Sequence, residues 1–338
     1  MVAQAQALEA NPPISLDTGI VEAAEAALGA IGAARTEIGR VIFGQQKVVD
    51  LSLITLLAGG HGLLVGVPGL AKTKLVEAMG NVLGMSARRV QFTPDLMPSD
   101  ILGSEVLDES ADGKRHFRFI KGPVFAQLLM ADEINRASPR TQSALLQSMQ
   151  EKHVTVAGKR YDLPAPFHVL ATQNPLEQEG TYPLPEAQLD RFMFNILLTY
   201  PSFAEEVSVV KNTTNDEAKS LSTILTSEDI IAYQHLVRKV PVPDNVIEYA
   251  VTLAGKTRPQ TAGASQVAND YLEWGAGPRA SQFLVLGAKC NALLNGKYSP
   301  DIEDVQAIAK PVLRHRIVRN FKAEAEGISV DDIITKLV

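Results

Sequence analysis

Residues 66–73 read Gly66-Val67-Pro68-Gly69-Leu70-Ala71-Lys72-Thr73. They follow the apolar run Gly62-Leu63-Leu64-Val65 and precede a helical pattern that begins at Leu75, so the sequence predicts a strand, a tight loop and a helix. Small residues in such a loop let successive backbone N–H groups turn toward a polyphosphate, and the N-terminus of the helix favours its negative charge. The stretch therefore predicts a nucleotide site in an α/β fold.

The side chains of this loop add to the prediction. Lys72 can reach the β- and γ-phosphates, and Thr73 can ligate Mg²⁺. The usual pattern has glycine before the lysine, where this chain has Ala71; we expect a helical backbone conformation there, which tolerates alanine. The alternative is a Gly/Pro turn with a surface lysine. The predicted nucleotide contacts of the loop are Gly66, Pro68, Gly69, Leu70, Ala71, Lys72, Thr73 and Lys74.

A second motif lies about sixty residues further on, where the apolar run Leu128-Leu129-Met130-Ala131 ends in Asp132-Glu133. A buried strand would deliver Asp132 to its carboxyl end, where it can hold Mg²⁺ through water or together with Thr73. Glu133 is then placed to polarise a water molecule against the γ-phosphate. The alternative, a strand that ends in solvated acids, loses weight beside Lys72 and Thr73.

Three further residues have the right chemistry for phosphoryl transfer. Asn174 follows the next apolar run, His168–Ala171, and its amide could hydrogen-bond the γ-phosphate or the attacking water; an asparagine before proline is also typical of a turn. Arg191 and Arg279 lie at element boundaries, where a guanidinium can stabilise a transferring phosphoryl group, even from a neighbouring subunit. Single arginines are equally common in surface ion pairs.

Composition limits the class of protein. The chain has 338 residues, a formal net charge of −6 and one cysteine, Cys290, which excludes an internal disulfide framework and a cysteine-rich metal site. Its bulk charge gives no argument for a nucleic-acid partner. No apolar run approaches the ~20 residues of a membrane span, and the N-terminus lacks a basic region followed by an apolar core. We expect a cytoplasmic protein.

The pattern predicts three regions: a flexible tail at 1–17, amphipathic helices followed by an α/β core at 18–200, and an all-helical domain at 201–338. In the last region, we expect one helix from Pro278 to Gly296 and another that starts at Ser299-Pro300 with a serine cap. The core should be a mostly parallel sheet covered by helices on both faces. Its predicted strands are 62–65, 88–92, 128–131, 168–171 and 192–198.

Two β-hairpins interrupt this core. One lies within 93–123 around the turn signal Asp112-Gly113, and the other within 151–164 around Ala157-Gly158. Neither is needed for nucleotide chemistry, so both are candidates for gripping a partner; the alternative is an architectural packing role.

This ordered set of motifs resembles the AAA+ ATPases from residue 18 to the C-terminus, and the two hairpins resemble the clade that carries both inserts. The details are most similar to the MoxR family. The strings that carry the resemblance are the alanine-containing loop at 66–73, QFTPDLMPSD at 91–100, ADEINRA at 131–137, ATQNP at 171–175 and EGTYPLPEAQLDRF at 179–192.

The resemblance implies a Mg²⁺-dependent ATPase with an AAA+ core and a helical lid. In it Lys72 and Thr73 contact phosphate and Mg²⁺, Asp132 and Glu133 are the metal-holding and catalytic acids, and Asn174 is the first sensor. It also implies that Arg191 is a finger that reaches the neighbour's γ-phosphate, and that Arg279 is the second sensor, acting within its own subunit or on the next. The segment that lines the adenine pocket in such proteins matches Val41, Ile42, Gly44 and Gln45.

The resemblance further implies a homo-oligomeric ring, a hexamer, that works as a chaperone-like remodeller. Such proteins assemble, activate or insert metal into client complexes, often with a partner that carries a von Willebrand factor A domain. The alternative within the clade is a nucleic-acid translocase or loader, in which Lys152, His153, Lys159 and Arg160 would track phosphates. The acidic chain and the lack of an appended DNA-binding module disfavour it. A switch with negligible turnover is disfavoured by Glu133 and Arg191.

Overall fold

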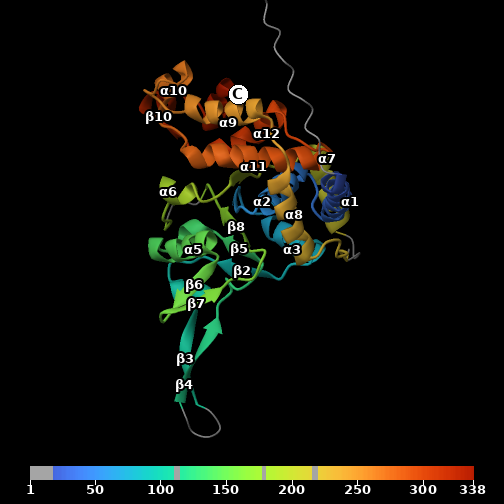
Figure 1. Cartoon of the computed structure of the whole chain (residues 1–338). Coiled ribbons are helices and arrows are strands. Elements are labelled where there is room, and N and C mark those ends of the chain that lie inside the picture. Colours follow the sequence, from blue (N-terminus) through green and yellow to red (C-terminus); the bar gives the residue numbers. More distant parts are fainter. Residues whose placement is uncertain (1–17, 110–114, 177–179, 215–219) are drawn as a thin grey trace, which may run out of the picture.

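The computed structural model describes residues 18–109, 115–176, 180–214 and 220–338. Figure 1 shows an α/β body, a helical layer above it and a long hairpin that projects below. The body is built on a five-stranded parallel sheet with the order β2-β5-β8-β1-β9. Its strands are β1 Gly62–Val65, β2 Ala87–Gln91, β5 Leu128–Asp132, β8 His168–Gln173 and β9 Phe194–Leu197. All five predicted strands are confirmed, with ends that shift by one or two residues.

The central strands β1, β5 and β8 are buried on both faces, which is why they read as largely apolar runs, whereas the edge strand β2 is mostly exposed. Leu64, Met130 and Leu170 belong to one hydrophobic cluster, which also includes residues of α1, α2 and α3. Leu63 and Leu129 belong to a second cluster with residues of α5. The helices of this part are α1 Thr18–Gly39, α2 Gln46–Leu57, α3 Lys72–Val82, α4 Pro98–Leu102 and α5 Pro139–Glu151, with a 3₁₀ turn at Ile134–Arg136.

Both predicted hairpins form. The projecting one consists of β3 Gly103–Glu109 and β4 Arg115–Lys121, and its predicted turn at Asp112-Gly113 lies outside the described residues. The second consists of β6 His153–Val156 and β7 Lys159–Asp162. Ala157 and Gly158 both have positive φ angles, 48° and 77°, as a two-residue hairpin turn of type I′ requires.

The two hairpins contact each other at the base of the projecting one. The rings of Phe119 and Tyr161 stack with their centroids 4.1 Å apart, and Lys159 forms an ion pair of 3.9 Å with Glu105. The second hairpin thus supports the first on one face, while Leu107 and Phe117 further out remain exposed.

The C-terminal third is helical, as predicted, with one addition: a two-stranded antiparallel ladder of β10 Leu272–Trp274 and β11 Val318–Arg319. Helix α12 begins at Ile302 rather than at Ser299, because Asp301 caps it and forms a capping box with Asp304. The predicted serine cap is therefore wrong. The remaining helices are α6 Glu186–Leu189, α7 Phe203–Thr213, α8 Ser227–Lys239, α9 Asp244–Lys256, α10 Gln266–Tyr271, α11 Pro278–Leu294, α12 Ile302–Leu313, α13 Phe321–Ala325 and α14 Val330–Leu337.

The helical layer packs directly on the sheet. A Cβ atom added to Gly287 of α11 would lie 2.9 Å from Ile308 Cδ1 and 3.1 Å from Phe194 Cζ of β9, so a larger residue there would require these side chains to shift. Residues 224 and 225 also donate backbone hydrogen bonds to Val82 at the end of α3. The domain boundary near residue 200 stays a prediction. Within the described residues, no helix is long and apolar enough to cross a membrane.

Two buried histidines, His61 directly before β1 and His168 at the start of β8, are held neutral. The Nδ1 atom of His61 accepts the Val169 N–H at 3.0 Å, and the Nδ1 atom of His168 lies 2.7 Å from the Gly60 carbonyl oxygen. Burial lowers the pKa of His61 to about 4 and that of His168 to about 3. Protonation of His61 would place a second donor against the Val169 N–H.

Because these histidines are neutral in the folded state, we expect acid to lower the free energy of unfolding. The unfolded chain binds protons at both side chains below about pH 6.5, whereas the folded chain does not until pH 4 or below. The free energy of unfolding therefore decreases as the pH falls through that window. We expect a loss of about 2 kcal/mol per histidine between pH 7 and pH 5. Urea unfolding at both pH values measures it. His61→Asn, which keeps an acceptor for Val169, should reduce the pH dependence; an unchanged dependence would contradict this assignment.

Candidate nucleotide site

The loop between β1 and α3 has the backbone of a phosphate cradle. Gly69 and Ala71 both have positive φ angles, 86° and 56°, which turns neighbouring N–H groups toward one side. A Cβ atom on Gly66 would lie 2.8 Å from Leu198, so glycine is needed there for close packing. The predicted helical conformation of Ala71 is wrong: the residue is left-handed, which costs a non-glycine residue about 1–2 kcal/mol. Strain of this kind is concentrated at functional loops.

Most of the predicted phosphate and metal residues meet in one cavity of about 400 Å³, although Gly66 and Leu70 do not line it. An ammonium group, a hydroxyl group, two carboxylates and the N-terminus of α3 converge there, and this set fits a triphosphate with Mg²⁺. Lys72 Nζ donates a hydrogen bond to the Gly66 carbonyl oxygen at 2.7 Å. The lining residues are Pro68, Gly69, Ala71, Lys72, Thr73, Lys74, Asp132 and Glu133.

Asp132 is buried and oriented from two neighbouring strands. Its Oδ1 atom accepts a hydrogen bond from the Thr172 hydroxyl at 2.5 Å. Its Oδ2 atom accepts from Arg89, with Nη2 at 2.5 Å and Nε at 3.1 Å. Both partners were missed from the sequence, because each lies about forty residues away along the chain. They could have been predicted only from the strand order, because β5 pairs with β2, which carries Arg89, and with β8, which carries Thr172.

Glu133 is held beside Asp132 by a left-handed backbone, with φ 53° and ψ 51°. Its N–H donates to Thr172 Oγ1 at 2.8 Å, so a single hydroxyl group links both acids. The Oε2 atom of Glu133 accepts hydrogen bonds from Gln91 at 2.7 Å and from Arg136 at 3.0 Å. These contacts fix the carboxylate at the edge of the cavity, where a base for water would be needed.

Asn174 directly follows β8, next to the phosphate loop, because Gly66 N donates to the Gln173 carbonyl oxygen at 3.2 Å. Its Oδ1 atom accepts from the Leu176 N–H at 3.1 Å, so the turn interpretation also holds. Asn174 does not line the cavity.

The predicted adenine segment is largely buried: Val41, Ile42 and Gln45 are buried and Gly44 is partly buried. Gln45 Nε2 donates a hydrogen bond to the Thr199 carbonyl oxygen. None of these residues lines the cavity either, so their role stays a prediction.

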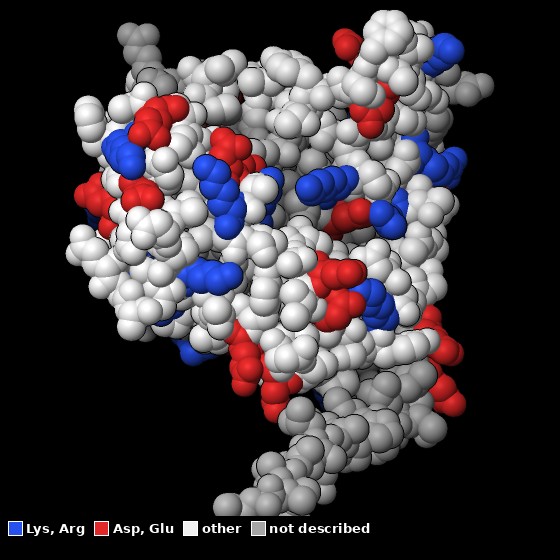
Figure 2. All heavy atoms as spheres, turned by 90° about the horizontal axis from the view of Figure 1, so that it is seen from above, with Lys and Arg blue, Asp and Glu red and all other residues white. Residues whose placement is uncertain are grey.

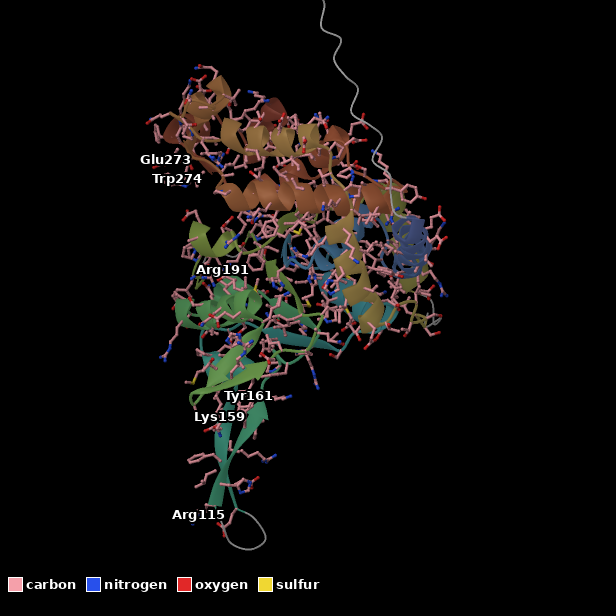
Figure 3. The ribbon with its side chains drawn as sticks, viewed as in Figure 1. Arg115, Lys159, Tyr161, Arg191, Glu273 and Trp274 are labelled. Atoms are coloured by element: carbon pink, nitrogen blue, oxygen red, sulfur yellow. The ribbon has the colours of Figure 1, made fainter. Side chains whose placement is uncertain are left out.

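The two predicted arginines lie apart from that cavity. Arg279, at the start of α11, forms an ion pair of 2.7 Å with Asp190. Arg191 is partly exposed, and its guanidinium group has no hydrogen-bond or ion-pair partner among the described residues. Figure 3 places Arg191 near α6, on the same side of the molecule as Trp274.

A buried cation missed from the sequence joins this group. Arg316 shares Asp190 with Arg279, through a bond of 2.7 Å from Nε to Oδ1, and its side chain is 1% exposed. Burial lowers the pKa of Arg316 to about 10, and Asp190 opposes that shift. Nothing in the sequence around Arg316 distinguishes it from a surface arginine; only the fold reveals its partner.

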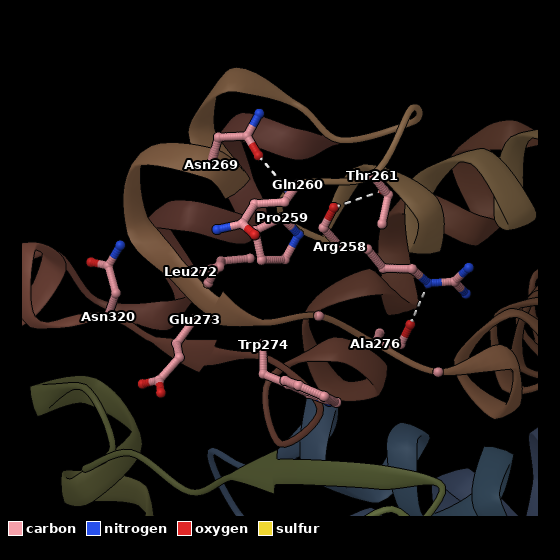
Figure 4. A pocket seen from close by; sticks show the side chains of 12 residues that line it. Arg258, Pro259, Gln260, Thr261, Asn269, Leu272, Glu273, Trp274, Ala276 and Asn320 are labelled. Carbon is pink, nitrogen blue, oxygen red and sulfur yellow. Dashed lines mark hydrogen bonds between the residues drawn. The ribbon is translucent and has the colours of Figure 1, made fainter.

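A larger cavity of about 630 Å³ lies in the helical layer and does not include any of the predicted site residues. Figure 4 shows its wall, where Arg258 Nε donates to the Ala276 carbonyl oxygen and Trp274 lies at the margin. The Trp274 side chain is 70% exposed. The described lining has one acidic side chain, Glu273, and no phosphate loop, so the nucleotide chemistry belongs to the smaller cavity.

Comparisons with known proteins agree with this geometry. A family model described as "ATPase family associated with various cellular activities (AAA)" matches residues 61–194, and one described as "AAA lid domain" matches residues 264–337. A solved structure from Cytophaga hutchinsonii, described as that of an ATPase, is 40% identical and has a TM-score of 0.87, with 95% of this chain and 96% of that chain covered.

Curated relatives extend over most of the chain. Chaperone MoxR1 of Mycobacterium tuberculosis is 40% identical over 332 residues, which cover 97% of this chain and 86% of the relative. Protein MoxR of Paracoccus denitrificans is 30% identical over 300 residues, which cover 84% and 87%. The chain therefore belongs to the MoxR family of AAA ATPases, whose members bind and hydrolyse ATP.

Proposed function

We propose that this protein is a Mg²⁺-dependent ATPase of chaperone type that works as a ring, a hexamer, and remodels client protein complexes. The observation that carries the proposal is the single cavity in which the phosphate loop meets Asp132 and Glu133, while Arg191 lies outside it. No arginine is among the residues that line this cavity, and Arg89 and Arg136 beside it bind the two acids, so we infer that a neighbouring copy supplies the guanidinium group for the γ-phosphate.

Within one subunit, the loop N–H groups and Lys72 would bind and orient the triphosphate. Thr73 and Asp132 would hold Mg²⁺, which neutralises charge between the β- and γ-phosphates when bound. Glu133 would accept a proton from the attacking water, and Asn174 would orient that water or the γ-phosphate. Arg89 and Thr172 would keep Asp132 in place, since both of its oxygens already accept their hydrogen bonds.

Assembly would supply the missing cation. Arg191 is partly exposed and without a partner in the described chain, as a residue offered to another subunit would be. Trp274, 70% exposed on the same side, supports an interface there, because tryptophan is enriched at the centres of protein interfaces. Arg279 forms an ion pair with Asp190, the residue next to Arg191, and so lies on the same side of the molecule. This position favours a role of Arg279 in the neighbour's site rather than in that of its own subunit.

The projecting hairpin would be the client handle. Leu107 and Phe117 are paired across β3 and β4 and are 56% and 66% exposed, far from the nucleotide cavity. Exposed apolar pairs of this kind are typical of protein contacts. The name of Chaperone MoxR1 supports a remodelling role. A client complex and a partner with a von Willebrand factor A domain remain proposals based on family resemblance.

The nucleic-acid alternative is not favoured. Of the four basic residues, His153 lies beside Glu151, Lys159 beside Glu105 and Arg160 beside Asp162, while Lys152 is exposed. Three of the four are thus next to carboxylates, which disfavours a phosphate track. The face shown in Figure 2 mixes acidic and basic side chains and has no large basic field.

Glu133→Gln tests the catalytic assignment. The amide keeps the size and the hydrogen-bonding reach of the side chain but cannot take a proton, so we expect ATP hydrolysis to fall about 100-fold or more. ATP binding, measured with a fluorescent analogue, should persist because the loop is intact. A variant that hydrolyses ATP at the parental rate would refute the role of Glu133.

Arg191→Ala tests assembly. Parental ATPase rate per subunit should rise with protein concentration as mass by light scattering rises, and the variant should lose about 10³-fold while still binding ATP and assembling. Arg238→Ala, an exposed arginine on α8, is the matched control and should retain parental activity. If the rate is independent of both concentration and Arg191, each chain hydrolyses ATP alone and the ring proposal fails.

A further inference from the structure

The chain on both sides of Arg191 is held by the helical layer. Arg314, His315 and Arg316, which follow α12, bind consecutive parts of residues 190–195, here called the finger segment. Arg314 Nη1 donates to the Asn195 carbonyl oxygen at 2.7 Å, and His315 Nε2 lies 3.0 Å from that of Phe192. The helical layer therefore contacts the finger segment along its length rather than at one point.

Arg316 uses most of its donors for this contact. Its Nη2 atom donates to the carbonyl oxygens of Asp190, at 3.0 Å, and Phe192, at 2.6 Å, which flank Arg191. Its Nη1 atom donates to Met193 at 3.1 Å. A guanidinium group is planar and rigid, so these bonds fix the backbone around Arg191 relative to α12.

The Asp190 carboxylate is the charged centre of this arrangement. One oxygen binds buried Arg316 and the other binds Arg279, each at 2.7 Å. Arg316 lies three residues after α12 and Arg279 lies at the start of α11, so the Asp190 side chain, next to Arg191 in the chain, binds two separate places in the helical layer. A carboxylate between two fixed cations has little freedom to change its position.

We propose that Asp190 is a positioning residue for hydrolysis in the neighbouring subunit: by binding Arg316 and Arg279, it couples Arg191 to the helical layer, so the two move together. This inference rests on the proposed function, in which Arg191 completes the neighbour's site. Asp190 does not line the nucleotide cavity of its own subunit. It acts through Arg191, and its loss should impair the site next door while its own subunit's cavity stays intact.

Asp190→Asn removes the charge and keeps the size and one acceptor, so the finger segment loses two ion pairs but not its shape. We expect kcat for ATP to fall at least tenfold, with unchanged nucleotide Kd and unchanged mass by light scattering. Asp50→Asn is the matched control. Asp50 forms a similar two-bond pair with Arg35, at 2.6 Å for both bonds, which joins α1 to α2 and involves none of residues 190–195. It should retain kcat within about twofold of the parent, since ion pairs away from a site change little.

Mixed rings decide between a neighbour's site and the subunit's own. Glu133→Gln subunits cannot hydrolyse ATP but carry an intact Arg191, and Asp190→Asn subunits have the reverse defect. Co-expressed in equal amounts, the two should restore activity in up to about a quarter of the sites, if subunits mix at random in a symmetric ring. Activity above the sum of the two separate variants supports the proposal. Parental kcat in Asp190→Asn alone would overturn it.

A reference mixture of Glu133→Gln with Arg191→Ala distinguishes failure of this inference from failure of the ring proposal. If the reference recovers activity and the Asp190→Asn mixture does not, Asp190 acts within its own subunit and only this inference fails. If the reference also fails to recover, Arg191 does not act on a neighbour, and the inference falls together with the ring proposal. Thermal unfolding of each variant identifies any that lose activity through misfolding.

Arg316→Lys keeps the charge but loses the planar guanidinium group that binds Asp190. Mixed with Glu133→Gln, it should restore activity as Asp190→Asn does.

Discussion

Parallel pairing of β1, β8 and β5 is the constraint on which the site depends. The register sets Val65 beside Gln173 and Ala131 beside Ala171, so the carboxyl ends of all three strands reach the same edge of the sheet. The phosphate loop and the two acids, about sixty residues apart in the chain, then meet in one cavity, and Asn174 lies next to the loop without lining that cavity. Ligands bind at the carboxyl ends of parallel strands for this reason. A shift of one residue in this register would turn Asp132 to the other face and separate it from Thr172.

Features that depend on neighbouring residues could be predicted from the sequence. The five strands, both hairpins and the lining of the nucleotide cavity follow from apolar runs, turn pairs and the loop at 66–73. Contacts between distant segments could not be predicted in this way. Arg89 binds Asp132 across 43 positions, and Arg316 binds Asp190 across 126. An isolated arginine in a sequence gives no indication of its partner, because pairing depends on which elements the fold brings together.

Two local predictions were wrong, for different physical reasons. At α12, serine and proline are good helix starters, but Asp301 forms reciprocal bonds with Asp304 that a start at Ser299 could not supply. At Ala71, the loop needs a left-handed residue to aim its N–H groups, and this chain accepts the strain in alanine. The resemblance to the MoxR family anticipated the alanine, while the conformation could be seen only in the structure.

The geometry of the projecting hairpin has a mechanical consequence. Strands β3 and β4 each have seven residues, so at about 3.4 Å per residue the described ladder is a lever roughly 24 Å long. Its fulcrum is the Phe119–Tyr161 stack, and Tyr161 lies in the hairpin that leads into β8, the strand that ends at Asn174. Phe119 lies four residues, or roughly 14 Å, from the far described end of β4 at Arg115, and two residues from its base at Lys121. A rotation of about 10° about the stack would displace Arg115 by roughly 2 Å, about twice the displacement at the base of the hairpin.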